Sequence, residues 1–303
     1  MKTKTETKKP SSESLKVIAL VGPTGSGKTG WAKILASKFK GKIISADSRQ
    51  VYRGMDIGTA KDKSFHQDMI DIIDPDKIFS VAEYQKMANE LIENYLKDEK
   101  LPMLVGGTGL YVEAVLYGFE LPELKEESLK LRQKLDKLND DELISQLREV
   151  DLRTAETIDL KNRRRVIRAL EYSLLNDLPF SSKATKRKPV YKSLIIAIDV
   201  PRETLYAKVD ARVEQQIKDG LIEEVRNLLK RYPADTPALN SIGYKEIIDY
   251  LNGKMELKEA IDRIKFNTHD YVRRQETWFK RNKKIKWVKH IEDAEKLIKR
   301  FVR

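Results

Sequence analysis

The segment VIALVGPTGSGKT, residues 17–29, decides the fold of this chain. Its first five residues are apolar and are typical of a buried strand. The next eight match the phosphate-binding pattern G-x-x-x-x-G-K-[ST] at every fixed position. A helix-like run continues from residue 31 to residue 39. Strand, glycine-rich loop and helix in this order predict a loop whose backbone N–H groups face phosphate oxygens.

Each residue type in this loop suits phosphate chemistry. The glycines let backbone amides approach the ligand, Lys28 supplies a full positive charge, and the Thr29 hydroxyl is placed to ligate Mg²⁺. The pattern predicts binding of a di- or triphosphate and leaves open which one. The candidate phosphate-binding residues are Gly22, Pro23, Thr24, Gly25, Ser26, Gly27, Lys28 and Thr29.

Composition restricts the class of protein. The 303 residues, 40% of them hydrophobic, are enough for the core of one large domain or two moderate ones. The absence of cysteine excludes disulfides, thiolate zinc sites and cysteine nucleophiles, and three scattered histidines disfavour a multi-histidine metal site. The net charge of +12 suggests a polyanionic partner such as nucleic acid, although a generally basic protein is the alternative.

The chain shows no sign of membrane insertion or export. No stretch approaches the roughly 18 apolar residues of a membrane span. Residues 1–14 are rich in Lys, Thr, Ser and Glu, which predicts a disordered tail rather than a signal peptide. We therefore expect a cytoplasmic protein.

Strand and helix patterns alternate over residues 16–118. Apolar strands are expected at 42–46 and 101–105, and a capping box at Ser80 and Glu83 opens a helix that reaches residue 97. The pattern resumes with a strand at 192–199, followed by helical segments at 201–220, 223–231, 243–251 and 256–280, a short strand at 285–289 and a last helix to residue 301. This alternation predicts an α/β fold with a parallel sheet covered by helices on both faces.

The stretch between these halves has a different character. It has no strand pattern and contains charged amphipathic segments at 126–138, 141–150 and 162–176. We therefore predict a helical domain inserted into the phosphate-loop core. The expected boundaries are a tail at 1–14, a core at 15–121 and 190–303, and the insert at 122–189.

Asp47 follows the second expected strand. Ligands of open α/β sheets bind at the carboxyl ends of the strands, so Asp47 is expected to face the phosphate loop. It could ligate Mg²⁺ or act as a general base, and a purely structural alternative is that it caps the next turn. The polar loop at 48–61 is expected to hold substrate.

The third expected strand ends in GGTGLY, residues 106–111, where an NTPase often carries a metal-binding aspartate. Its absence disfavours a motor or switch. Glycines here would let a flat substrate approach closely, and Thr108 could hydrogen-bond that substrate. The purely structural alternative is an ordinary glycine-rich turn between strand and helix.

Two basic clusters stand out. Arg163, Arg164, Arg165 and Arg168 open a helix and are joined by basic residues at 183–188, which favours an RNA-phosphate surface over a merely solvated face. The second cluster, at 273–284, is interleaved with aromatic residues that we interpret mainly as packing. Those aromatic residues are Tyr271, Trp278 and Phe279.

Six segments together resemble one enzyme family. They are GPTGSGKT (22–29), ISADSRQVYRGMDIGTAK (44–61), LVGGTGLY (104–111), NRRRVIRALE (162–171), IGYKE (242–246) and RRQETWFKR (273–281). In this order they closely resemble the tRNA dimethylallyltransferases, also called tRNA isopentenyltransferases, over nearly the whole chain. Eukaryotic relatives often add a Cys/His zinc finger, so the lack of cysteine indicates the bacterial type.

The resemblance implies a reaction. A dimethylallyl group would pass from dimethylallyl diphosphate to N6 of the adenosine at tRNA position 37, 3′ of the anticodon, with release of diphosphate. Asp47 would be the general base and Thr108 a hydrogen-bonding group at the reaction centre. Lys28, Arg212 and Mg²⁺ on Thr29 would neutralise the diphosphate. From its local sequence alone, Arg212 is interpreted as a helix-surface residue.

The resemblance also implies how tRNA is held. A flipped adenosine would enter a channel through the core, and the insert would clamp the anticodon stem-loop. The enzyme is expected to act as a monomer. The implied tRNA-binding residues are Asp47, Ser48, Arg49, Gln50, Arg132, Arg163, Arg164, Arg165, Arg168, Asn240, Ser241, Ile242, Gly243, Tyr244 and Lys245.

Three other functions compete with this one. A small-molecule kinase would share the phosphate loop but has little use for a long helical insert. An adenylate (AMP) dimethylallyltransferase would share the core motifs but needs no large basic insert. A non-catalytic RNA-binding module would explain the charge and leave Lys28, Asp47 and Thr108 without a role.

Overall fold

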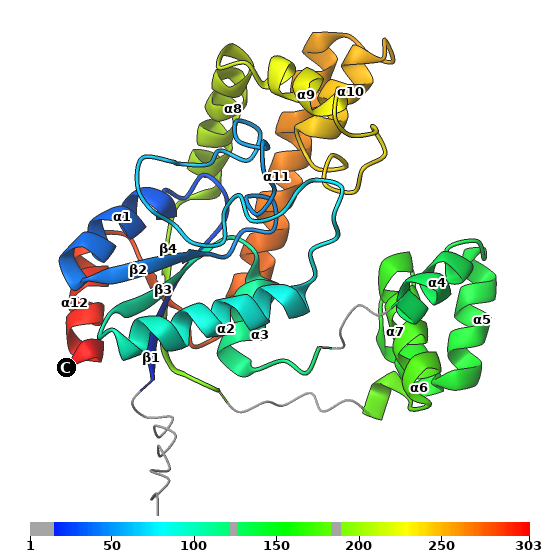
Figure 1. Ribbon diagram of the computed structural model, residues 1–303, viewed down its shortest axis with the longest axis horizontal. Helices are drawn as coiled ribbons and strands as arrows, with labels where there is room; N and C mark the ends of the chain where they lie inside the picture. Colours follow the sequence, from blue (N-terminus) through cyan, green and yellow to red (C-terminus); the bar gives the residue numbers. More distant parts are fainter. Residues whose placement is uncertain (1–14, 122–125, 183–188) are drawn as a thin grey trace, which may run out of the picture. The chain divides into compact units, whose positions relative to one another are not determined.

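The computed structural model describes residues 15–121, 126–182 and 189–303. Two compact units are present, one built from residues up to 119 together with 189–303, and one from residues 120–188 (Figure 1). The expected tail at 1–14 and the basic residues at 183–188 lie outside the described residues. In the described ranges, no helix is both long enough and apolar enough to cross a membrane.

The first unit is built on a parallel sheet. Within the described chain, the strand order is β2-β3-β1-β4-β5, and every pairing is parallel. The expected parallel α/β core is confirmed. Strands buried on both faces are apolar throughout rather than alternating, which is why segments such as 17–21 could be identified from sequence. The strands are β1 (Lys16–Val21), β2 (Gly41–Ser45), β3 (Leu101–Gly106), β4 (Lys192–Ile198) and β5 (Lys286–Val288).

Helices cover both faces of this sheet (Figure 1). On one face, α1 (Lys28–Phe39) and α12 (Ile291–Val302) pack through residues such as Leu35 and Ile298. On the other face lie α2 (Val81–Lys97), α3 (Gly109–Tyr117) and the end of α11 (Leu257–Arg281). The predicted capping box is present: Ser80 and Glu83 exchange hydrogen bonds at the start of α2.

A second hydrophobic cluster lies beyond the carboxyl ends of the strands. It joins the long loop at 46–79 to the beginning of α11 and to α8 (Arg202–Lys218), α9 (Leu221–Leu229) and α10 (Tyr244–Leu251). Glu224 of α9 anchors this loop, because its carboxylate accepts hydrogen bonds from three consecutive backbone amides, at residues 56–58. The loop is therefore fixed over the edge of the sheet where ligands bind.

The second unit is helical in its described part. It contains α4 (Glu126–Leu135), α5 (Asp140–Val150), α6 (Leu152–Thr157), α7 (Arg163–Asn176) and a 3-10 turn, η1 (Phe180–Ser182). Its core includes Leu143, Leu147, Val166 and Leu170. Helix α6 was not expected from sequence, because six residues are too few to show a helical period.

Candidate active site

The loop at 22–29 joins β1 to α1. Gly22, Gly25 and Gly27 have φ angles of 146°, 82° and 86°, a region that residues with a Cβ rarely adopt. Gly27 is the N-cap of α1 and provides no side-chain cap. The first amides of a helix have no partner within the helix, so this end of α1 offers N–H groups and partial positive charge to an anion.

Lys28 is enclosed by this loop. Its Nζ donates a hydrogen bond to the carbonyl of Pro23 at 3.2 Å. Burial lowers the pKa of Lys28 to about 8; the charge of Asp47 opposes this shift, and that of Arg212 adds to it. A bound anion would favour the charged form of the lysine.

Arg212 projects from α8 to the same loop. Its Nη2 donates to the Thr24 hydroxyl at 2.7 Å, and burial lowers the pKa of its guanidinium. The interpretation of Arg212 as a helix-surface residue is therefore wrong. Among the described residues, Arg212 Nε and Ser26 Oγ are buried without a hydrogen-bond partner. Unpaired buried polar groups are costly, and Arg212 lines both cavities described below, so its Nε indicates a place for a polar ligand; Ser26 lines neither cavity.

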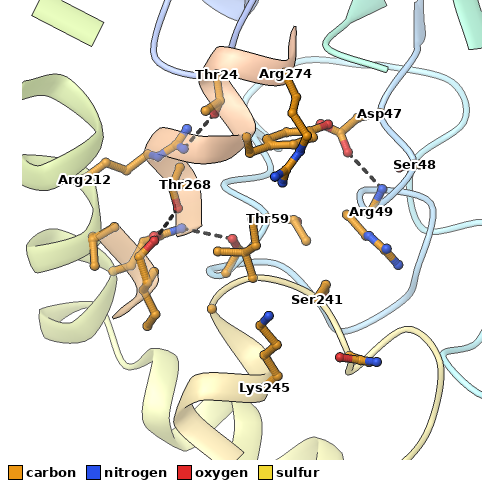
Figure 2. A pocket seen from close by; sticks show the side chains of 18 residues that line it. Thr24, Asp47, Ser48, Arg49, Thr59, Arg212, Ser241, Lys245, Thr268 and Arg274 are labelled. Carbon is orange, nitrogen blue, oxygen red and sulfur yellow. Dashed lines mark hydrogen bonds between the residues drawn. The ribbon is translucent and has the colours of Figure 1, made fainter. Parts of the chain in front are cut away.

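Asp47 lies just beyond β2, and one of the roles considered for it, capping of the next turn, is present. Its Oδ1 accepts hydrogen bonds from the backbone amides of Arg49 (2.9 Å; Figure 2) and Gln50 (3.4 Å), so it does cap the following turn. No residue in the described part of the chain hydrogen-bonds its Oδ2. The carboxylate thus has one oxygen engaged in structure and one available for chemistry.

Thr108 sits at the start of α3, behind the Asp47 turn. Its backbone amide donates to the carbonyl of Ala46, and its hydroxyl accepts from the amide of Ser48, both at 3.0 Å. Nearby Tyr271 of α11 has its pKa raised to about 12, mainly by burial and also by the Asp47 charge, while a hydrogen bond with Thr108 opposes the rise. Thr108 does not line either of the two cavities described below.

The expectation that the glycines around Thr108 admit a flat substrate is wrong. A Cβ on Gly106 would lie 2.1 Å from the carbonyl oxygen of Ala46. On Gly107 it would lie 2.2 Å from Gln275 Nε2, and on Gly109 2.2 Å from Trp278. The protein's own atoms fill this space, so these glycines allow close packing of strand β3 and helix α3 against β2 and α11.

Two cavities meet in front of Asp47. One, of about 320 Å³, is shown in Figure 2, and the other, of about 300 Å³, contains the phosphate loop. Thr24, Asp47, Thr59 and Arg212 line both. We call the first the acceptor chamber and the second the donor chamber. Asp47 is the one carboxylate that lines both cavities.

The acceptor chamber is strongly basic. Its charged lining consists of the cations Arg49, Arg212, Lys245 and Arg274, with Asp47 as the one carboxylate among the lining residues. Figure 2 shows these side chains coming from separate elements: the Asp47 turn, α8, α10 and α11. Such a lining suits an anionic substrate that presents a group able to give up a proton.

The segment at 240–245 contributes most of its residues to the acceptor chamber. Asn240, Ser241, Ile242, Gly243 and Lys245 line it. Tyr244 does not, because it is fully buried and its hydroxyl donates to Glu224 at 2.6 Å. The expectation of direct tRNA contact is therefore corrected for Tyr244, which instead holds the segment in place.

Gln50 also lies elsewhere than expected. Its side chain accepts from the Ser45 hydroxyl (3.3 Å), donates to the carbonyl of Thr59 (3.1 Å) and lines the donor chamber. Ser48 and Arg49 line the acceptor chamber. Gln50 thus lines the donor chamber and not the acceptor chamber.

The arginines of the second unit divide into two groups. Arg132 and Arg168 both pair with Glu171, at 2.8 and 3.0 Å, and Glu171 is only 1% exposed. Burial alone would raise the pKa of Glu171, but these hydrogen bonds hold it below its usual value. The contacts assign both arginines a structural role within this unit.

Arg163 is likewise engaged internally. Its guanidinium donates to the carbonyls of Leu138 (2.6 Å) and Asp136 (3.0 Å) and pairs with Asp140. These contacts hold Arg163 within this unit, and its contact with RNA stays a prediction. Arg164 and Arg165 are exposed and form no ion pair with any described residue.

Several cavity residues were missed by sequence reasoning. Thr268, Tyr271 and Arg274 of α11 line the acceptor chamber, and Gln216 of α8 does so as well. The interpretation of the aromatic residues as packing holds for Phe279 but not for Tyr271. A long amphipathic helix can bury one stretch against a core and expose another to a cavity, and its periodicity does not distinguish the two.

The donor chamber offers few protein ligands to a metal ion, because Asp47 is the one carboxylate among its lining residues. The described residues contain no group of three or more His, Cys, Asp or Glu side chains that could hold a metal. Mg²⁺ needs no such cage when substrate phosphates and water complete its octahedral shell. Thr29 and Asp47 both line the donor chamber and fit an ion that arrives with a diphosphate.

Known proteins give a consistent comparison. The profile of the family described as IPP transferase matches residues 50–282. A tRNA dimethylallyltransferase of Anoxybacillus flavithermus is 42% identical over 286 residues, 92% of each chain. One from Roseiflexus sp. (strain RS-1) is 43% identical over 274 residues, 88% of this chain and 90% of the relative.

Solved structures that are similar to this chain are also transferases of this kind by title. The tRNA isopentenylpyrophosphate transferase of Bacillus halodurans is 37% identical, with a TM-score of 0.72 over 95% of this chain and 96% of that one. A eukaryotic dimethylallyltransferase, described as acting on tRNA, is 25% identical, with a TM-score of 0.75 over 87% of this chain and 69% of its own.

Proposed function

This chain belongs to the tRNA dimethylallyltransferase (IPP transferase) family, and we propose that it prenylates tRNA. The reaction moves a dimethylallyl group from dimethylallyl diphosphate to N6 of adenosine 37, 3′ of the anticodon, and releases diphosphate. The observation that carries this proposal is the meeting of a phosphate-loop chamber and a basic chamber at a single carboxylate, Asp47.

The donor chamber accounts for the departure of diphosphate. Its negative charge would be matched by Lys28, Arg212 and the amides at the start of α1, and Arg212 Nε would gain the partner that it lacks. Mg²⁺, held between Thr29 and the phosphates, would supply further charge stabilisation. Preorganised cations of this kind stabilise charge that grows as the bond to the leaving group breaks.

The acceptor chamber accounts for activation of the nucleophile. The adenine N6 lone pair is delocalised into the ring, so the amine gains nucleophilicity only as it loses a proton. Asp47 Oδ2 is free to take that proton while Oδ1 keeps the turn in place. The N6–carbon bond forms, the carbon–oxygen bond to diphosphate breaks, and the N6 proton passes to Asp47.

The RNA would be held by positive charge on both units. In the core, Arg49, Lys245 and Arg274 line the acceptor chamber, where a flipped nucleotide and its flanking phosphates would lie. In the second unit, Arg164 and Arg165 are exposed for phosphate contacts.

The competing functions fit less well. A kinase would consume ATP, and an adenylate dimethylallyltransferase would accept free AMP. The relatives above, matched over about nine-tenths of this chain, are tRNA-modifying transferases by name. A purely RNA-binding role leaves the half-buried Lys28 and Arg212 beside the loop unexplained.

Nucleoside mass spectrometry tests the proposal directly. Unmodified tRNA is incubated with the protein, Mg²⁺ and dimethylallyl diphosphate, digested and analysed for prenylated adenosine. A transcript with guanosine at position 37 is the matched control and should stay unmodified. Modification of free AMP instead of tRNA, or stoichiometric ATP hydrolysis, would overturn the proposal.

A further inference from the structure

Gln275 of α11 connects the phosphate loop to the segment that follows strand β3. Its side chain is buried, with 5% exposure. Its Oε1 accepts a hydrogen bond from the backbone amide of Thr24, and its Nε2 donates to the backbone carbonyl of Gly107, both at 2.9 Å. One amide group therefore ties the phosphate loop to the end of strand β3.

The two hydrogen bonds of Gln275 lead to Arg212 on one side and to the Asp47 turn on the other. Thr24 also receives the hydrogen bond of Arg212. Gly107 precedes Thr108, whose amide and hydroxyl hold Ala46 and Ser48, the two neighbours of Asp47. A displacement of Gln275 would therefore move the phosphate loop, and also the Asp47 turn by way of Thr108.

The site leaves little tolerance for another side chain. A Cβ on Gly107 would lie 2.2 Å from Gln275 Nε2, so the amide packs directly on the strand backbone. The position requires one acceptor and one donor at the same time; an amide of this length provides both at any pH, whereas a carboxyl group does so only when protonated. A carboxylate would face the Gly107 carbonyl with a second acceptor, and a thioether would supply no comparable bond.

We propose that Gln275 is a positioning residue, which sets the distance between the diphosphate loop and the Asp47 base without touching either substrate. This inference rests on the proposed prenyl transfer. Displacements of about 1 Å at a reaction centre can cost about 100-fold in rate, so loss of the link should reduce kcat by roughly 10- to 100-fold.

Two substitutions test it, each compared with wild type at the same pH. Q275M keeps the approximate volume and loses both bonds, so its kcat should be low at every pH. Q275E keeps the Thr24 contact but opposes the Gly107 carbonyl. It should be impaired at pH 8 and recover at pH 6, where its protonated carboxyl can donate, because burial beside an acceptor raises a carboxyl pKa. The affinity for an anticodon stem-loop should stay within about twofold for both.

Matched controls come from Gln215, an exposed residue of α8 that bonds only to Asp219 within the described chain. Q215M and Q215E should behave like wild type. Melting temperatures show which variants are folded. If Q275M is not folded, the test depends on whether the activity of Q275E recovers at pH 6. Wild-type kcat and donor KM in folded variants, or an activity ratio for Q275E that does not change with pH, would overturn the inference. Lack of activity in the wild type would instead overturn the proposed function.

Discussion

Replacement of Asp47 by Asn separates its two roles. Asparagine keeps a carbonyl oxygen that can accept from the amides of Arg49 and Gln50, at 2.9 and 3.4 Å in the native turn. It cannot take a proton from N6. We therefore expect the turn, and with it the free energy of unfolding, to change by less than about 0.5 kcal/mol.

The effect on turnover should be much larger. General-base catalysis typically contributes about 10²- to 10⁴-fold, which corresponds to about 3–5 kcal/mol of barrier. The companion variant Asp47→Ala loses the cap as well and should be destabilised by a further ~1 kcal/mol. Comparison of the two variants thus assigns a kinetic cost to the lost base and a stability cost to the lost cap.

The assay is single-turnover prenyl transfer to a saturating anticodon stem-loop, with RNA affinity and melting temperature measured in parallel. Affinity should change little, since phosphate contacts dominate it. If Asp47→Asn keeps more than about a tenth of the wild-type rate, Asp47 is a positioning residue and the proton leaves by another route.

Further predictions concern charge and loop anchoring. Burial lowers the pKa of Lys28 to about 8, so the lysine is mostly charged at pH 7 and mostly neutral at pH 9. The KM for dimethylallyl diphosphate should therefore rise about tenfold from pH 7 to pH 9. A KM that does not change with pH would contradict a role of the Lys28 charge in binding the diphosphate. Replacing Arg164 and Arg165 together by Ala should reduce the log–log salt slope of RNA binding by roughly 1.4–1.8, whereas an unchanged slope would identify a solvated face. Glu224→Ala should lower the free energy of unfolding by about 2–4 kcal/mol, because the amides at 56–58 lose their acceptor, while Glu223→Ala, at an exposed position, should be nearly neutral in thermal melts.

The sheet and its phosphate loop could be predicted from the sequence because their signals are local. A strand buried on both faces is a continuous apolar run, and the loop needs glycine at fixed spacing to adopt its φ angles. The capping box at Ser80 is equally local, since both partners lie within four residues. Asp47 could be placed at the ligand-binding edge by the general topology of parallel sheets.

The remaining features depend on contacts between residues far apart in the chain. Arg212 reaches Thr24 across 188 positions and Gln275 reaches it across 251, and neither helix carries a local mark of that contact. The same holds for the arginines of the second unit: four look alike in sequence, and only the fold pairs Arg168 with the buried Glu171, engages Arg163 with backbone carbonyls, and leaves Arg164 and Arg165 exposed. Residue type and spacing thus determined the sheet, the loop and the class of chemistry. The tertiary structure decided which charges face substrate, because the pairing of a side chain depends on what the fold brings beside it.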